Sequence, residues 1–210
     1  LSDVSGLREF FDLVFLSVKC YDTEWMTHLI RPHLQPTGCV LPAMNGLNDE
    51  KVAQIVGYGR TVGCVTTISA GVYDPGHVVR TDPTTLHAFS VGELSGIVTP
   101  RGKEIVEALQ VIGESTATTN IWGARYAKLV WNAMGNVLAG LIGPGSASLT
   151  QEQRDLATTV RVVTGCEAAK VAFALGISVE PVGGIPATDL AQATTIEAMR
   201  ALKLQVEAAT

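Results

Sequence analysis

The chain has 210 residues, of which 47% are hydrophobic and 17% charged, and its formal net charge is -5. A chain of this size can bury a sizeable core, in one large or two small domains. The negative charge, the scattered basic residues and the aromatic content of 6% argue against nucleic acid as a partner. The apolar runs are too short or too broken by glycine to cross a membrane.

The cysteines carry information about redox chemistry and metals. Cys20, Cys39, Cys64 and Cys166 form no C-x-x-C pair, and none has a histidine at metal-ligand spacing. We therefore expect small buried thiols, a cytoplasmic location and no metal site.

The first part of the chain, residues 1–119, mixes strand and helix patterns. Its beginning is expected to contain, in order, a strand at 12–18, a helix at 23–34, a strand at 39–42, a loop at 43–48 and a helix ending near 56. The first strand is a continuous apolar run, which is typical of a parallel strand buried on both faces. This alternation predicts a doubly wound α/β sheet with right-handed crossovers.

A smaller antiparallel part is expected next. Residues 61–69 are rich in Val, Thr and Ile, and the turn 73–76 precedes short strands near 77–80 and 86–91. We expect these last two strands to form a hairpin appended to the parallel sheet. A helix at 100–112 and a short strand at 115–119 complete this part.

From residue 120 onward the periodicity is helical, which predicts an all-α second domain at 120–210. Its helices are expected at about 121–142, 150–175 and 187–206. The glycine-rich stretch 143–148 is interpreted as a helix–helix connection, because no strand precedes it and no Lys-Ser or Lys-Thr pair follows.

The two ends of the sequence suggest a fragment. Little sequence precedes the strand at 12–18, although a buried parallel strand needs a neighbour on each side. The last residues, 205–210, continue a helical pattern without a stop signal. We therefore expect the earlier strands of the sheet and the C-terminal end to be missing.

A polar stripe on the expected helix 121–142 is the strongest candidate site. Lys128, Asn132 and Asn136 recur at intervals of four on an otherwise apolar helix, which we expect to be largely buried. A buried ammonium and two amides are costly unless polar groups or a ligand satisfy them. A carbonyl or hydroxyl substrate would suit these groups. The alternative, which spacing alone favours, is that Lys128 reaches solvent and the amides cap nearby loops.

Two further polar features lie at the ends of expected strands. Lys19 follows the strand 12–18, and Asn45-Gly46 follows the strand 39–42. Open α/β sheets bind ligands at the carboxyl ends of their strands, so these residues are candidates for a binding site. Alone, each has a simpler explanation: Lys19 leaves the sheet for solvent, and Asn-Gly forms a turn.

Four stretches, in this order and spacing, resemble the ketopantoate reductase (2-dehydropantoate 2-reductase) family. They are Asp12–Lys19 with Tyr21-Asp22, Leu41–Leu47, Val62–Thr67 with Pro75-Gly76, and Ala127–Asn136. The resemblance extends from Phe11 to about Gly184, and the Lys-x3-Asn-x3-Asn helix is its most specific part.

The resemblance implies a Rossmann-type NADP-binding domain, of which 1–119 is the C-terminal part. It also implies a helical substrate and catalytic domain, incomplete at 120–210 and similar to the C-terminal domain of 6-phosphogluconate dehydrogenase. The implied activity is the NADPH-dependent reduction of 2-dehydropantoate, or a related 2-oxo acid, to pantoate for pantothenate and coenzyme A synthesis. A small-molecule substrate and a homodimer are the implied partners.

The resemblance also implies residue roles. Lys128 matches the catalytic lysine, Asn132 and Asn136 match substrate-binding asparagines, and Lys19 and Asn45 match residues beside the cofactor. An ammonium at Lys128 can stabilise charge on a ketone oxygen and then donate a proton. We expect all five side chains to share one cleft, and the fragment itself to be inactive.

The sequence departs from the family pattern in several places. It contains no G-x-G-x-x-G, Val137 stands where the family usually has proline after the second asparagine, and Gly135 replaces a larger apolar residue. The family's late serine and acidic residue are expected beyond Thr210. Two alternatives therefore stay open: another β-hydroxyacid-type dehydrogenase, and a non-catalytic Rossmann-like scaffold. A G-x-G-x-x-G upstream would favour an enzyme over the scaffold.

Overall fold

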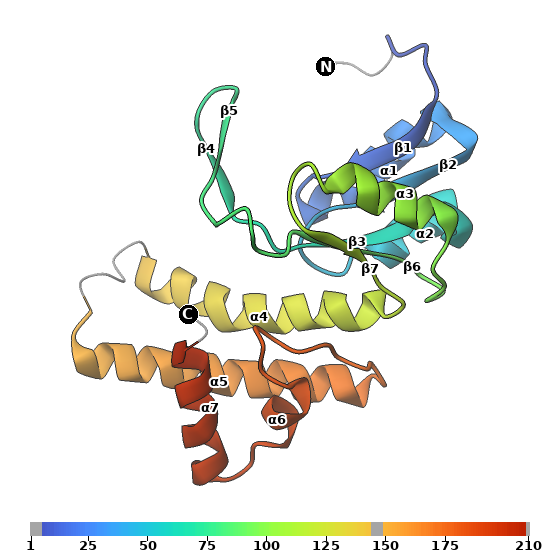
Figure 1. Ribbon diagram of the computed structural model, residues 1–210. Coiled ribbons are helices and arrows are strands. Elements are labelled where there is room, and N and C mark those ends of the chain that lie inside the picture. Colours follow the sequence, from blue (N-terminus) through green and yellow to red (C-terminus); the bar gives the residue numbers. More distant parts are fainter. Residues whose placement is uncertain (1–5, 144–148, 209–210) are drawn as a thin grey trace. The chain divides into compact units, whose positions relative to one another are not determined.

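The computed structural model describes residues 6–143 and 149–208, and the chain divides into two compact units, Leu1–Ile121 and Trp122–Thr210 (Figure 1). Residues 144–148 of the expected helix–helix connection lie outside the described residues. The described helices include none that is long and apolar enough to cross a membrane.

The first unit follows the expected alternation of strands and helices. Its elements are β1 (Phe11–Leu16), α1 (Thr23–Ile30), β2 (Leu34–Pro42), α2 (Asp49–Val56), β3 (Val62–Thr66), β4 (Ala70–Asp74), β5 (His77–Arg80), β6 (Phe89–Glu93), α3 (Pro100–Leu109) and β7 (Ser115–Ala117). Short 3-10 turns occupy Cys20–Asp22, Arg31–His33 and Tyr58–Arg60.

The strands of this unit form a mixed arrangement. β1 and β2 are parallel, with Leu16 opposite Pro42 at their carboxyl ends. An isolated parallel bridge between Val40 and Thr61 continues from β2 toward β3. β3 then pairs with β6 in antiparallel fashion, and β6 pairs in parallel with β7. In the part of the chain that the structure describes, no strand pairs with the other edge of β1.

Alternate residues of β2 supply two cores on opposite faces of the strand. Cys39 and Leu41 pack in a cluster that includes Ile105 of α3, whereas Val40 packs in a cluster that includes Val52 of α2. Successive side chains of a strand point to opposite faces, so the run Cys39–Pro42 is apolar throughout because both faces are covered. The expectation of burial on both faces is wrong for the first strand, since Phe15 of β1 is 47% exposed.

The expected hairpin between 77–80 and 86–91 is wrong. β5 pairs instead with β4, across the turn that contains Gly76 at φ +79°, and β6 joins β3. The difference follows from burial: Phe89 and Val91 are 6% and 1% exposed, whereas Val72 and Val78 of the β4–β5 hairpin are 63% and 67% exposed. Phe89 and Val91 therefore belong to the main core, and β4 and β5 form the appended hairpin.

The second unit is helical. It contains α4 (Ile121–Ile142), which begins one residue before the boundary, followed by α5 (Gln151–Ala174), α6 (Ala187–Gln192) and α7 (Ile196–Ala208). The expected single helix at 187–206 is two helices, because Ala193 leaves the helix with extended backbone and Thr195 caps the start of α7. The Thr195 hydroxyl accepts a 3.1 Å hydrogen bond from the Ala198 amide, as an N-cap does.

Candidate functional site

Lys19 and Asn45 lie at the same edge of the sheet. Lys19 follows β1 and Asn45 follows β2, and both are exposed. The two strands are parallel neighbours, and the Ala43 amide donates a 3.0 Å hydrogen bond to the Leu16 carbonyl just beyond their paired ends. This carboxyl edge is where open α/β sheets bind ligands, so the two residues occupy the expected position.

The loop that carries Asn45 is tied to the neighbouring helix by buried polar groups. Gly46 has φ +90°, which forms the turn expected of Asn-Gly. The Asn48 side-chain amide donates a 2.9 Å hydrogen bond to the Asn45 carbonyl. The Asn48 Oδ1 lies 3.2 Å from the hydroxyl of Thr23 at the start of α1. Sequence reasoning missed Asn48 and Thr23, which are 25 residues apart and carry no motif of their own.

Lys128, Asn132 and Asn136 lie along α4 in the second unit. Lys128 and Asn132 are partly buried, whereas Asn136 is exposed. Burial disfavours the charged ammonium and lowers the pKa of Lys128 from its ordinary value. The structure therefore places a lysine with a lowered pKa one turn from a carboxamide on the same helix.

The polar stripe lies on the other side of α4 from the buried face, which consists of Ala127, Val130, Met134 and Leu138. The expectation of a largely buried helix is wrong for its C-terminal half. Val137 and Leu141 are 43% and 74% exposed, although each follows a buried residue of α4 by three positions. The α4 residues of the core cluster end at Met134, so the last turns of the helix extend beyond this cluster.

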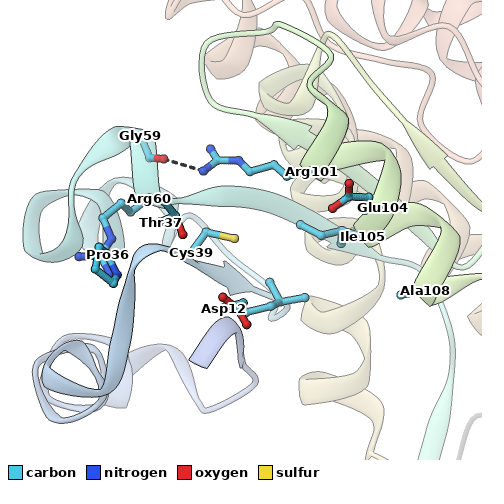
Figure 2. A pocket seen from close by; sticks show the side chains of 11 residues that line it. Asp12, Pro36, Thr37, Cys39, Gly59, Arg60, Arg101, Glu104, Ile105 and Ala108 are labelled. Atoms are coloured by element: carbon cyan, nitrogen blue, oxygen red, sulfur yellow. Dashed lines mark hydrogen bonds between the residues drawn. The ribbon is translucent and has the colours of Figure 1, made fainter. Parts of the chain in front are cut away.

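A cavity of about 640 Å³ lies elsewhere in the first unit, against α3 (Figure 2). The Arg101 guanidinium donates a 2.8 Å hydrogen bond to the Gly59 carbonyl beside it and forms an ion pair with Glu93. The lining comes from the early residues of β1 and β2, the turn after α2 and one face of α3: Asp12, Leu13, Pro36, Thr37, Cys39, Gly59, Arg60, Arg101, Glu104, Ile105 and Ala108.

None of the candidate site residues expected from the sequence lines this cavity. Asp12 and Thr37 are early residues of parallel strands, whereas Lys19 and Asn45 follow the carboxyl ends of the same strands. The guanidinium of Arg101 is already held by Glu93 and by the Gly59 carbonyl. We therefore take the carboxyl edge, and not this cavity, as the candidate binding site of the unit.

We found no candidate metal site within residues 6–143 and 149–208. No group of three or more His, Cys, Asp or Glu side chains there could hold a metal ion. The four cysteines form no disulfide, and Cys20, which we expected to be buried, is exposed.

Comparison with known proteins identifies relatives of the chain. Residues 6–96 match the family model described as ketopantoate reductase PanE/ApbA. A curated 2-dehydropantoate 2-reductase from Archaeoglobus fulgidus is 32% identical over 132 residues, which are 62% of this chain and 42% of that protein. The chain is a partial-length homologue of the ketopantoate reductases. The family resemblance predicted from the sequence is thereby confirmed.

The chain spans about half the length of the curated relatives it matches, between 42% and 53% of each. Among solved structures, 2-dehydropantoate 2-reductase from Geobacter metallireducens has a TM-score of 0.62 and 20% identity, with 96% of this chain and 78% of that chain covered. A complex of D-mandelate dehydrogenase with NADH has a TM-score of 0.69 and 21% identity, with coverage of 90% and 61%. The expected Rossmann-type sheet followed by a helical domain is confirmed as the fold.

Proposed function

We propose that the natural full-length protein reduces 2-dehydropantoate, or a related 2-oxo acid, to the 2-hydroxy acid with NADPH. The observation that carries this proposal is the polar stripe of α4, where the partly buried Lys128 stands one turn from the partly buried Asn132. The names of the relatives, all 2-dehydropantoate 2-reductases among the curated matches, support the same reaction class.

Lys128 supplies the acid in this proposal. Reduction of a ketone builds negative charge on its oxygen, and an ammonium placed there stabilises that charge and then donates a proton. Burial lowers the pKa of Lys128, which makes its ammonium a stronger acid than that of an exposed lysine. Asn132, with one donor and one acceptor group, orients the carboxylate or hydroxyl of the substrate, and Asn136 serves the same purpose farther along the helix.

The residues at the sheet edge fit a nicotinamide nucleotide in part. Lys19 and Asn45 are both exposed, and they follow neighbouring parallel strands. Lys19 offers a cation for a phosphate, and Asn45 offers an amide for a polar substituent of the nicotinamide ring. A reduced nicotinamide supplies the hydride when bound. The glycine-rich phosphate loop of such sites is absent from this sequence, so these residues account for only one side of a nucleotide site.

The reaction sets a requirement on the whole protein. Hydride transfer needs the nucleotide and the ketone in contact, so the proposal requires the Lys19–Asn45 edge and the Lys128–Asn132–Asn136 stripe to serve one site. The proposal also assigns residues 1–119 to nucleotide binding and residues 120–210 to substrate binding and proton transfer.

Activity measurements on the natural full-length protein test the proposal. The purified protein is incubated with NADPH or NADH and with a panel that contains 2-dehydropantoate, short aliphatic 2-oxo acids and an aromatic 2-oxo acid. We expect oxidation of NADPH to be fastest with 2-dehydropantoate. The aromatic substrate with NADH is included because the fold is shared with D-mandelate dehydrogenase. Absence of nucleotide oxidation with every 2-oxo acid would favour the scaffold alternative.

Two further proposals concern the state of the protein. The four cysteines that form no disulfide support a cytoplasmic location, since disulfides are rare in reducing compartments. A homodimer, implied by the resemblance, stays a prediction that light scattering of the full-length protein can check.

A further inference from the structure

We propose that Thr23 and Asn48 are positioning residues, which hold the Asn45 loop against the loop that carries Lys19. The proposal rests on the proposed function, in which Asn45 and Lys19 contact the nucleotide. Neither positioning residue is available to a ligand, since Thr23 is 0% and Asn48 is 3% exposed. They therefore act through the loops and not on the substrate.

The contacts form a continuous path between the two loops. The Asn48 Nδ2 donates to the Asn45 carbonyl at 2.9 Å, and the Asn48 Oδ1 faces the Thr23 hydroxyl at 3.2 Å. The same hydroxyl lies 2.9 Å from the carbonyl of Cys20, the residue after Lys19. Its single proton is shared among these two acceptors, one from each loop, and the Met44 Sδ, which lies 3.5 Å from the hydroxyl oxygen and belongs to the Asn45 loop. The path thus runs from the backbone beside Lys19 to the backbone of Asn45 itself.

The direction of the Asn48 side chain is the independent observation. Asn48 is the N-cap residue of α2, where an asparagine side chain commonly accepts a hydrogen bond from the first turn of its own helix. Here it makes no such bond and instead reaches back to the Asn45 carbonyl. The side chain is therefore committed to the shape of the loop and not to the start of the helix.

Burial makes this arrangement well defined. A buried amide or hydroxyl that loses its partner is costly, so the Thr23–Asn48 pair favours one loop conformation over others. The adjacent Gly46, at φ +90°, completes the turn, and the fixed Asn45 carbonyl sets the direction in which the Asn45 side chain leaves the backbone. The pair pre-organises one contact residue of the nucleotide.

Matched substitutions in the full-length protein test the proposal. Thr23→Val removes the hydroxyl with little change of shape, Thr23→Ser keeps it, and Asn48→Asp removes the donor to the Asn45 carbonyl. We expect Thr23→Val to lower kcat/KM for the nucleotide by about fivefold, the factor that one neutral hydrogen bond is worth. Asn48→Asp also places a carboxylate beside the Asn45 carbonyl and is expected to lower kcat/KM at least as much. Thr23→Ser is expected to keep the wild-type value.

The same substitutions in an Asn45→Ala background separate positioning from general stability. If Thr23 acts through Asn45, Thr23→Val causes no further loss of kcat/KM once the Asn45 side chain is gone. An equal loss in both backgrounds would overturn the proposal, as would a Thr23→Ser enzyme as impaired as Thr23→Val.

Failure of the proposed function gives a different result. If the wild-type protein reduces no 2-oxo acid, the effect of the Thr23–Asn48 pair on the loop is tested by amide hydrogen exchange of the segment 43–48. Thr23→Val is then expected to speed exchange in this segment relative to Thr23→Ser, while exchange in β3 stays unchanged. Equal protection of the segment in the two variants would overturn the positioning role independently of any activity.

Discussion

Gly183 packs directly against the indole of Trp131, so closely that a Cβ at position 183 would overlap the six-membered ring. The glycine has φ +57°, a conformation that L side chains rarely adopt. Trp131 lies on α4 immediately before Asn132, and it packs against the core of the second unit. The contact therefore helps to set the rotation of the helix that carries the polar stripe.

Gly183→Ala is expected to destabilise the protein more than Gly184→Ala. Both glycines have positive φ, but a Cβ at Gly184 meets nothing within 4 Å. Backbone strain costs each variant about 1 kcal/mol, and overlap with Trp131 adds about 1–3 kcal/mol at position 183. Urea unfolding of both variants measures the difference. Equal midpoints would contradict the packing described for Trp131.

The ion pair between Arg101 and Glu93 gives a second stability prediction. The guanidinium contacts both carboxylate oxygens, at 2.7 and 2.5 Å, and the Glu93 side chain is 7% exposed. Arg101→Met would leave a buried carboxylate without its cation, which costs about 3 kcal/mol, at the lower end of the usual range because the Arg101 side chain is 32% exposed. Arg101→Lys keeps the charge and should recover part of this loss. Urea unfolding that shows no loss for Arg101→Met would contradict a stabilising role.

The elements that local pattern determines could be predicted from the sequence. Residues close together in the chain predict β1 and β2, the helices after them and the Asn45-Gly46 turn. The strand partner of β6 and the exposure of Leu141 could not be predicted in this way. Each depends on which residues, distant in the chain, pack against the segment. For the same reason, the Thr23–Asn48 contact became visible only in the structure.

The pH dependence of the reaction should report Lys128. Burial lowers its pKa, and an acid must be protonated to act, so kcat is expected to be retained below this pKa and lost as the pH rises through it. The loss should therefore begin at a lower pH than for a lysine of ordinary pKa. Lys128→Arg, which stays charged, should show a lower kcat without this alkaline limb. An identical limb in Lys128→Arg would assign the titration to another group.

Asn132→Ala is expected to act mainly on the substrate. An orienting amide contacts the 2-oxo acid before and during reaction, so its loss should raise KM by about tenfold and lower kcat less. Asn136→Ala, from the exposed end of the stripe, should show the same pattern with a smaller change. Steady-state kinetics at saturating NADPH separate the two parameters. An unchanged KM in both variants would reduce these asparagines to packing residues.

The most direct test of the account is the kcat of Lys128→Ala in the natural full-length protein, measured with NADPH and 2-dehydropantoate. Loss of a positioned acid predicts a decrease of about 100-fold, with the affinity for NADPH nearly unchanged because the proposal assigns nucleotide binding to the other unit. Lys170→Ala, which removes an exposed lysine from α5, is the matched control and should keep the wild-type kcat. A Lys128→Ala enzyme with the kcat of the wild type would contradict the proposed role of the stripe.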